Sequence, residues 1–394
     1  MVINKKPIEQ LYEDLPADTK EMLDRAIGSI VSAKKAGGKV VVVTGSGPNL
    51  HEGVTTLIAE LIHKGVIDGV TTSSAVIAHE MAGSLEEVKR VDGLKLGFTE
   101  KILPRGNIFE ATLMSPDFLE ELKKEMLIDT ALLEKVLSLD GSIIIKAAGN
   151  MAYPLGLRTE NLAKEILFIA KSKGFSFEQV AGAGADPHTM LGAAYAKGIP
   201  ILVTIPQLVG GGMVGLAIGD SISLTERATK VARMIQSADV IIESAVALTQ
   251  EIHDGPFETY TGHGLWSQWE GYDTYSLKDK TLIRIDLDPA LKKAWEFEKQ
   301  SSQVQDAIDK GLPKTKLMSI PFRMEMSGFA RLEKSIPVVA DLGVVWPMMA
   351  LRLEKELGLS LDFISYPQQS SEGQAMRKWI VENVSPIVKK KLFQ

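Results

Sequence analysis

The sequence predicts an α/β protein built on a doubly wound, mostly parallel sheet with irregular insertions. Short segments that are apolar throughout, such as Val40–Thr44, alternate along the chain with helical segments. Strands that are continuous apolar runs are typical of parallel sheets covered by helices on both faces. The chain has 394 residues, of which 45% are hydrophobic and 24% charged. A chain of this length is either one large α/β domain spanning residues 1–394 or two fused α/β units, and we expect the former.

Each expected strand is a short apolar run that ends in a turn, and each expected helix has apolar residues at three- and four-residue spacing. The strands are Val40–Thr44, Val66–Thr72, Ser142–Lys146, Gln179–Gly182, Ile199–Ile205, Val240–Ile242, Leu282–Asp286 and Pro337–Asp341. The helices are Pro16–Ala36, Val54–Lys64, Ala75–Ala82, Pro116–Leu137, Thr159–Lys173, Thr189–Lys197, Leu224–Ser237, Ala290–Lys299, Val344–Leu357 and Gln374–Lys390. The insertions that interrupt this alternation are Gly83–Ser115, His253–Ser276 and Ser301–Ser335.

Composition excludes several classes of function. The formal net charge is −6, which disfavours a nucleic-acid partner. There are no cysteines, so disulfides and thiolate chemistry are excluded, and the pairs His51-Glu52 and His79-Glu80 lack a metal-binding spacing. The first residues lack the apolar core of a signal peptide. The uncharged stretch Gly198–Gly219 contains six glycines and two prolines, which favours a strand and a loop over a membrane span. We therefore expect a cytoplasmic protein without metal or membrane partners.

The turn after the first strand is the first candidate ligand-binding segment. Thr44–Gly53 contains Gly45, Ser46, Gly47 and Asn49 between a strand and a helix. Glycines in such a turn allow backbone N–H groups to approach an anion, and the loops after parallel strands form the ligand crevice of this fold class. The segment matches neither a GxGxxG nor a Walker motif, and the alternative is a tight turn without a ligand.

The turn after the second strand is the next candidate. Thr72, Ser73 and Ser74 offer small hydroxyl groups that can bind a phosphate or ribose without crowding it. His79 follows on the helix, where it is either a catalytic group or a structural hydrogen-bonding residue. Because both turns follow neighbouring strands, we expect them to line one shared crevice.

Further along the chain, Asp186 and the triple glycine around Gly211 are expected to contact the cofactor, and His188 to contact the substrate. Asp186 precedes a proline and a helix, so its alternative role is a helix N-cap. The three glycines have no packing purpose that is evident in the sequence, which favours a flexible loop over a ligand.

A titratable cluster follows the strand Val240–Ile242. It contains Glu243, His253 and Asp254, and a histidine beside a carboxylate is the usual means of proton transfer near neutral pH. We expect these three residues, together with His79, to be catalytic. The alternative is that Asp-Gly-Pro is an ordinary turn.

An aromatic and glycine-rich segment comes next, and it is expected to contact the substrate. Glu258, His263 and Trp266 lie in or beside Tyr260–Tyr275, which has the composition of a lid or an oligomer contact. At the end of the next strand, Asp286 and Asp288 are expected to bind ribose hydroxyls, although Asp288 is equally suited to capping the helix that follows.

The chain resembles two related families of nicotinamide-dinucleotide proteins. Asn49–Gly53 and Leu61–Thr72 are similar to the dinucleotide segment of deoxyhypusine synthase. Ser73–Glu80, Asp286–Pro289 and Ala340–Gly343 are similar to motifs of the LOR/SDH family, of the ornithine cyclodeaminase type. The resemblance implies a Rossmann-like, deoxyhypusine synthase-like fold, bound NAD and a homo-oligomer, either a dimer or a tetramer.

One departure from that resemblance limits the chemistry. Thr249 stands where deoxyhypusine synthase has its imine-forming lysine, so a true deoxyhypusine synthase is not expected. The leading hypothesis is transient oxidation of a small amine or hydroxyl substrate at its C–N or C–O carbon, followed by elimination, cyclisation or transfer. The alternatives are a hydroxy-acid dehydrogenase, in which Arg105, Arg158 or Lys146 would bind a carboxylate, and a nucleotide-binding regulatory protein that is not an enzyme.

The expected organisation follows from these assignments. Residues 1–38 form an N-terminal helical segment, 39–300 the NAD-binding core, and 301–394 a C-terminal extension of helices and a strand. No composition shift marks a linker, so these are subdivisions of one domain rather than separate domains.

Overall fold

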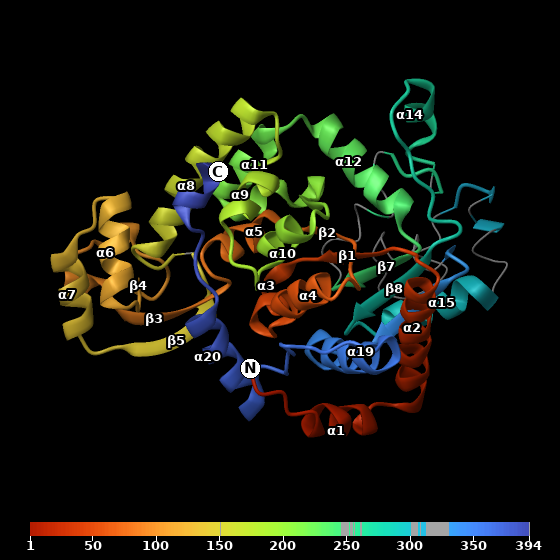
Figure 1. The fold of residues 1–394 in the computed structure, drawn as a ribbon, viewed down its shortest axis with the longest axis horizontal. Helices are drawn as coiled ribbons and strands as arrows, with labels where there is room; N and C mark the ends of the chain where they lie inside the picture. The colour runs from red at the N-terminus through yellow and green to blue at the C-terminus, as the bar shows by residue number, and fades with distance from the viewer. Residues whose placement is uncertain are drawn as a thin grey trace.

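A computed structural model describes residues 1–149, 151–245, 252, 255, 257–260, 262–300, 306, 307, 309–312 and 331–393. Its centre is a six-stranded sheet in the order β6-β2-β1-β7-β8-β9 (Figure 1). All five strand pairs are parallel. The strands are β1 Val40–Thr44, β2 Gly69–Thr72, β6 Ile201–Val203, β7 Val240–Ser244, β8 Thr281–Asp286 and β9 Ser335–Val339. Strands β2 and β6 lie on one side of β1, and β7, β8 and β9 lie on the other, so the strand order reverses between β1 and β7.

Helices cover both faces of this sheet, as the continuous apolar strands require. Val42 and Val70 face one core, which α2, α4, α5 and α19 also line, whereas Val41 and Val43 face a second core lined by α12 and α15. The helices are α1 Lys6–Asp14, α2 Ala17–Lys35, α3 Ser46–His51, α4 Val54–His63, α5 Ser74–Met81, α6 Pro116–Glu125, α7 Thr130–Ser138, α8 Leu155–Lys173, α9 Phe177–Gly184, α10 Met190–Lys197, α11 Met213–Ser221, α12 Leu224–Ser237, α14 Leu265–Trp269, α15 Ala290–Gln300, α19 Leu342–Leu357 and α20 Ser371–Asn383. The 3-10 helices are η1 Gly93–Leu96, η2 Glu100–Ile102, η3 Ile205–Gly211 and η5 Lys389–Phe393.

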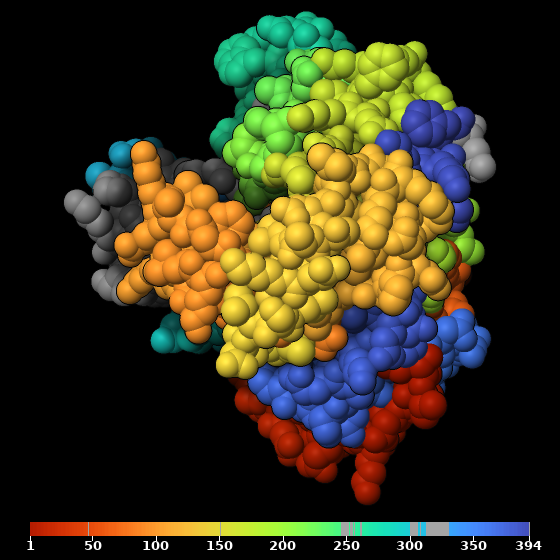
Figure 2. Space-filling view, turned by 90° about the vertical axis from the view of Figure 1, so that its left-hand side faces the viewer, coloured from red at the N-terminus to blue at the C-terminus, as the bar shows by residue number. Residues whose placement is uncertain are grey.

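The predicted doubly wound, mostly parallel α/β fold is confirmed, but residues 85–147 form a smaller unit that the prediction did not include. β3 Leu85–Asp92, β4 Ile108–Thr112 and β5 Ser142–Ala147 make an antiparallel sheet in the order β4-β3-β5. Helices α6 and α7 pack on one face around their own apolar core. Figure 2 shows this small subdomain, orange to yellow, lying against the blue C-terminal helix α20, which contacts β3 and β5.

Two strand predictions are corrected. Gln179–Gly182 lies within the helix α9, because the Ser176 hydroxyl accepts a hydrogen bond from the Gln179 N–H and begins a helix there. A short apolar run does not distinguish a buried helix from a strand. Ser142–Lys146 is a strand, as predicted, but it belongs to the antiparallel sheet of the small subdomain.

Two helix predictions are also corrected. Pro116–Leu137 is two helices, since Met126 is extended and the Asp129 carboxylate caps α7 through the Leu132 N–H. The helix predicted over Gln374–Lys390 ends at Asn383. Strand β9 belongs to the central sheet, so the subdivision at residue 300 crosses that sheet. Among the described helices, none combines the length and apolar composition needed to cross a bilayer.

Candidate functional site

The carboxyl ends of β1, β2 and β6 meet at one edge of the central sheet and present threonine hydroxyls. Thr44 ends β1, Thr72 ends β2, and Thr204 follows β6. The pairing of Val43 with Thr71 makes Thr44 and Thr72 neighbours, and the Thr204 N–H donates to the Thr72 carbonyl at 3.0 Å. All three hydroxyl oxygens are buried and have no hydrogen-bond partner in the described part of the chain. Buried hydroxyls usually have one.

The first predicted turn lies at this edge, where the strand order reverses between β1 and β7. It forms the short helix α3, with Gly45 extended and Gly47 in the first turn, one residue after Ser46. A buried polar chain holds it: the Trp346 indole N–H donates to the Ser244 hydroxyl at 2.8 Å, and that hydroxyl donates to the Asn49 side-chain carbonyl at 2.7 Å. Asn49 also donates its amide hydrogens to the carbonyl of Gly45. The side chain of Asn49 therefore shapes the turn from inside.

The second predicted turn lies beside the first at the same edge of the sheet, and the shared crevice stays a prediction. Ser73 caps α5 by accepting a hydrogen bond from the Val76 N–H. Ser74 donates to the Gln207 carbonyl at 2.6 Å and accepts from the Gly211 N–H at 2.9 Å. A Cβ on Gly211 would lie 2.6 Å from the Ser74 carbonyl oxygen. Gly211 therefore does have a packing purpose, because η3 approaches the backbone of α5 too closely at this position for a side chain.

Two histidines lie on the helices that follow these turns. The Nδ1 atom of His79, on α5, lies 2.7 Å from the Ala148 carbonyl oxygen. The Nδ1 atom of His51, at the end of α3, lies 3.3 Å from the guanidinium of Arg377, which also donates to the Ile145 carbonyl. Burial lowers the pKa of both imidazoles, and the positive charge of Arg377 lowers that of His51 further. Both side chains are therefore neutral at pH 7.

The small subdomain turns a charged face toward these histidines. Lys146 on β5 pairs with Glu110 on β4 at 2.5 Å, and Arg90 on β3 pairs with Glu110 at 3.1 Å. The Glu86 carboxylate accepts from the Thr112 hydroxyl at 2.6 Å. Burial raises the pKa of Glu86 to about 7, so half of this carboxyl is protonated near neutral pH. Perturbed titratable groups gather at functional sites more often than elsewhere.

The structure places Asp186 and His188 away from this edge. Their loop contacts the far end of α4, where the His63 Nε2 atom lies 2.8 Å from the Pro187 carbonyl. Helix α4 follows the turn at the carboxyl edge, so its C-terminus lies toward the other end of the sheet. The Asp186 carboxylate bonds to the His188 side chain at 2.9 Å and accepts from the Ser385 N–H. Neither residue therefore joins the two turns.

Glu243 and the two predicted ribose-binding aspartates have structural contacts. Glu243 is fully buried on the face opposite Thr44 and pairs with Arg284 at 3.7 Å. Arg284 also pairs with Asp286 at 3.6 Å. Asp288 accepts a hydrogen bond from the Ala290 N–H at 2.9 Å. This contact is the one expected of a residue that caps the following helix. Glu243 is thus a member of a buried ion cluster and is not exposed as a base.

The aromatic segment is described in part. Glu258 is fully buried and its carboxylate accepts from the Tyr260 N–H, so it is enclosed by its own loop. His263 is exposed, and 62% of Trp266 is exposed on α14, which projects from the body in Figure 1. The predicted catalytic residues His253 and Asp254 lie outside the described residues.

The cations considered for a carboxylate-binding site are mostly engaged. Arg158 is buried and pairs with Glu125 at 2.7 Å, and it also donates to the Ile387 carbonyl at 2.8 Å. Lys146 pairs with Glu110. Arg105 is exposed on the small subdomain. The hydroxy-acid alternative therefore gains no support from these three residues.

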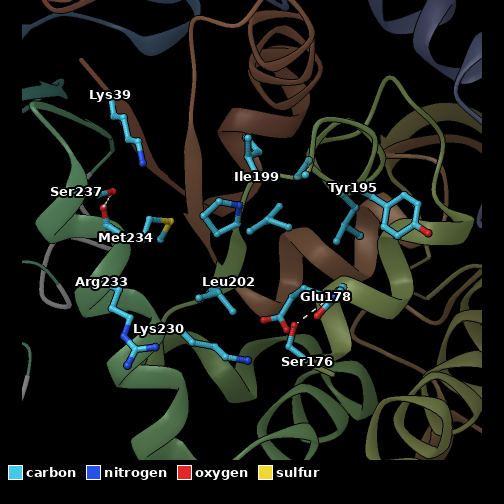
Figure 3. A pocket seen from close by; sticks show the side chains of 16 residues that line it. Lys39, Ser176, Glu178, Tyr195, Ile199, Leu202, Lys230, Arg233, Met234 and Ser237 are labelled. Carbon is cyan, nitrogen blue, oxygen red and sulfur yellow. Dashed lines mark hydrogen bonds between the residues drawn. The ribbon is translucent and has the colours of Figure 1, made fainter. Parts of the chain in front are cut away.

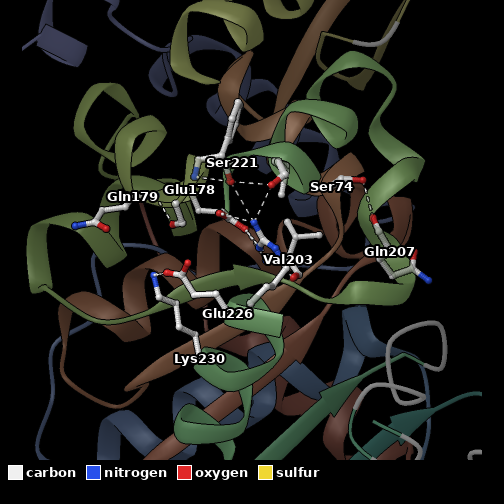
Figure 4. Close-up of polar contacts among 12 residues, drawn as sticks. Ser74, Glu178, Gln179, Val203, Gln207, Ser221, Glu226 and Lys230 are labelled. Carbon is white, nitrogen blue, oxygen red and sulfur yellow. Dashed lines mark hydrogen bonds and ion pairs between the residues drawn. The ribbon is translucent and has the colours of Figure 1, made fainter. Parts of the chain in front are cut away.

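A separate cavity of about 630 Å³ lies beside the edge strand β6. Figure 3 shows Leu202 and Met234 at its floor and Lys39, Lys230 and Arg233 around it. A buried ion pair of Glu178 and Arg227 satisfies the outward-facing backbone groups of β6 next to this cavity (Figure 4). Glu178 accepts from the Val203 N–H at 2.8 Å, and Arg227 donates to the Val203 carbonyl at 3.3 Å. Arg227 and Glu178 thus occupy the hydrogen-bonding positions of a further strand.

Several residues of this edge were not singled out in the sequence. Thr44 was placed in the first turn but given no role, and Thr204, His51 and Arg377 were given none either. A threonine at or just after the end of three strands is a signal that the sequence does contain. The contact between Arg377 and His51 has no such signal, because 326 residues separate the two side chains.

The strand order and the position of both turns define an α/β protein with a Rossmann-like fold. No protein-family model and no curated protein matches the chain. Among solved structures it is similar to a conserved LOR/SDH protein from Methanococcus maripaludis S2, with 12% identity, a TM-score of 0.38, and coverage of 88% of this chain and 72% of the other.

Two further similar structures are ArgZ, an arginine dihydrolase from the ornithine–ammonia cycle in cyanobacteria, and AgrE in a ternary complex with ornithine and NAD+. ArgZ is 12% identical with a TM-score of 0.39, covering 86% of this chain and 32% of that chain. AgrE is 13% identical with a TM-score of 0.41, covering 90% and 34%. The chain thus spans about a third of the length of each. Its function is inferred below from its own residues.

Proposed function

We propose that the chain is an NAD-dependent enzyme that acts on a small polar substrate bearing an amine or a hydroxyl group. The observation that carries the proposal is the row of buried, unpartnered hydroxyls of Thr44 and Thr72, which end neighbouring strands beside the reversal of strand order. In open parallel sheets, ligands bind outside the carboxyl ends of the strands at such a reversal.

The residues at this edge fit a dinucleotide through hydroxyl groups. Thr44 and Thr72 lie on the same face of the sheet, since residues paired in neighbouring parallel strands point the same way. Each hydroxyl can donate to a phosphate or ribose oxygen or accept from a ribose hydroxyl. Ser73 and Ser74 are already bonded within the protein, so they hold the turn in place. When bound, a nicotinamide ring accepts or returns a hydride.

Charged and neutral polar groups beside this edge suit a small polar substrate. Among the predicted catalytic residues that the structure describes, His79 is the one that lies at this edge. Its imidazole is neutral at pH 7 and can therefore accept a proton. Lys146 and Glu110 add a charge of each sign on the neighbouring sheet. An amino acid or a polyamine-like compound carries the amine or hydroxyl groups that such residues recognise.

The test compares two isosteric substitutions on adjacent residues of β2. Thr72→Val removes the hydroxyl at the edge, whereas Thr71→Val removes an equally buried, unpartnered hydroxyl on the opposite face. A lost hydrogen bond of about 1 kcal/mol weakens binding roughly fivefold. We expect Thr72→Val to weaken NAD binding by that factor in calorimetry, and Thr71→Val to leave it within twofold of the wild type.

Mass spectrometry of small molecules released from the denatured protein gives a second reading, because a tightly held dinucleotide co-purifies. NADP is titrated alongside NAD. Absence of binding for both dinucleotides, together with no co-purified nucleotide, would overturn the proposal. Equal weakening by the two valine variants would instead show that the threonine row is not the binding surface.

A further inference from the structure

The two histidines beside the carboxyl edge have opposite tautomers, and their partners determine which. An arginine guanidinium only donates hydrogen bonds, so the contact of Arg377 with His51 requires an unprotonated Nδ1 on His51. A carbonyl oxygen only accepts, so the contact of Ala148 with His79 requires Nδ1–H on His79. In the neutral rings, Nε2 of His51 therefore carries a hydrogen and Nε2 of His79 carries a lone pair.

The two rings are near each other. Helices α3 and α5 are in contact, and α3 also contacts β5 of the small subdomain. A charge on His79 would lower the pKa of His51, and Lys146 lowers the pKa of both rings. The other charged groups around the pair are Arg377 on α20, with Glu52 near it, and Glu110, which pairs with Lys146. Two cations thus oppose protonation of the imidazoles.

We propose that His51 and His79 form a donor–acceptor pair that binds one hydroxyl or neutral amine group of the substrate. His51 Nε2–H donates to the oxygen or nitrogen of that group, while His79 Nε2 accepts its hydrogen. Arg377 is a positioning residue, because it acts only by holding His51 in the donor tautomer. This pair rests on the proposed function for its substrate, but the tautomers themselves do not.

The pair also defines a proton transfer. For a hydroxyl substrate, the O–H bond breaks, its electron pair stays on the oxygen, and the proton forms a bond to His79 Nε2. His51 Nε2–H then stabilises the negative charge that develops. Neither ring needs to lose a proton beforehand, since both are neutral at pH 7.

The tautomers are measurable without cofactor or turnover. The chain has six histidines, and long-range proton–nitrogen NMR distinguishes Nδ1–H from Nε2–H in each ring. His51→Gln and His79→Asn assign the two signals, and the asparagine retains an amide N–H for the Ala148 carbonyl. We expect His51 as the Nε2–H form and His79 as the Nδ1–H form at pH 7 and at pH 8.

The role of Arg377 is tested with a matched pair of variants. Arg377→Met should free His51, which then becomes a mixture of tautomers with a pKa nearer 6.5, whereas Arg352→Met removes an arginine on α19 and should leave both rings unchanged. A single unchanged tautomer of His51 in Arg377→Met would overturn the positioning role. Observing His51 as Nδ1–H, or either ring as charged at pH 7, would overturn the pair.

Two small probes test the ligand class. 1,4-Butanediol, added at millimolar concentration at pH 8, should shift the Nε2 signals of His51 and His79 but not those of His63 and His188. 1,4-Diaminobutane, whose amines are protonated at pH 8 and cannot accept a hydrogen bond, should shift neither pair of signals. If 1,4-butanediol does not shift the first two signals, the ligand class is wrong. Loss of NAD binding with both tautomers intact would instead remove the proposed function and leave the histidine pair standing.

Discussion

Replacing Arg227 by methionine removes one partner of a fully buried ion pair. The guanidinium donates to both oxygens of Glu178, to the Val203 carbonyl at 3.3 Å and to the Ile218 carbonyl at 2.9 Å. Neither member of the pair has any exposed surface. In the variant, Glu178 keeps only the Val203 N–H among these contacts. It is then a buried carboxylate whose countercharge has been removed.

The magnitude follows from this loss. Removing one partner of a buried ion pair costs about 3–5 kcal/mol, because the remaining charge is desolvated without compensation. Methionine has a similar length and fills much of the space, so the cavity adds little. A double variant, Glu178→Met with Arg227→Met, removes both charges and should regain part of the loss. The exposed pair of Lys230 and Glu226 is the control, since Lys230→Met should cost under about 0.5 kcal/mol.

Urea unfolding at pH 7, followed by circular dichroism, measures all three variants. We expect the order of stability to be wild type and Lys230→Met, then the double variant, then Arg227→Met. A cost for Arg227→Met as small as that for Lys230→Met would refute the reasoning, because it would mean that the ion pair contributes no more than a surface pair. The same variant should weaken NAD binding, since the pair anchors Val203 of β6, which pairs with Thr72 of β2.

Two further substitutions test the packing around α5. Glu80 is fully buried and accepts from the Met190 and Leu191 N–H groups, and burial raises its pKa from 4.5 to about 7. Because the pKa of Glu80 is higher in the folded protein than in the unfolded chain, its protonated form stabilises the folded state fully below pH 4.5. This contribution of about 3 kcal/mol is lost as the pH rises through 7. Glu80→Gln should therefore flatten the urea-derived stability between pH 5 and 8 by about 2–3 kcal/mol, and an unchanged slope would contradict this. Gly211→Ala should destabilise the folded protein by about 1–3 kcal/mol. Gly210→Ala is the control and should be tolerated, because its Cβ would meet nothing nearer than 3.8 Å. Equal melting temperatures for the two variants would contradict the close approach at Gly211.

The central sheet was predictable because most of its strands contain short runs of consecutive apolar residues. Val40–Thr44 was predicted with the bounds that the structure has, and the predicted Leu282–Asp286 differs from β8 by one residue. The small sheet was not predictable in the same way. Its strand β3 has apolar residues only at Leu85, Val88 and Val91, a spacing that does not match the two-residue period of a strand. A segment this rich in charged residues, inside an insertion, has the pattern expected of a loop.

The turns after β1 and β2 were correctly placed together, because adjacent strands in a parallel sheet have their carboxyl ends on one side. Asp186 and His188 were misplaced for the opposite reason. They follow α9, which was expected to be a strand, so their loop was assigned to a strand end that does not exist. One wrong element therefore moved two residues into the predicted site.

The tautomers of the two histidines cannot be predicted from the residues near them in the sequence. His51 and His79 lie close because α3 and α5 begin at neighbouring strand ends, which the sequence does predict. Their tautomers, however, depend on the Ala148 carbonyl at the end of β5 and on Arg377 of α20. Both partners arrive through the small subdomain and the C-terminal helix that packs on it. The residue that follows β5 and a residue of α20 thus supply the hydrogen bonds that decide which ring donates and which accepts.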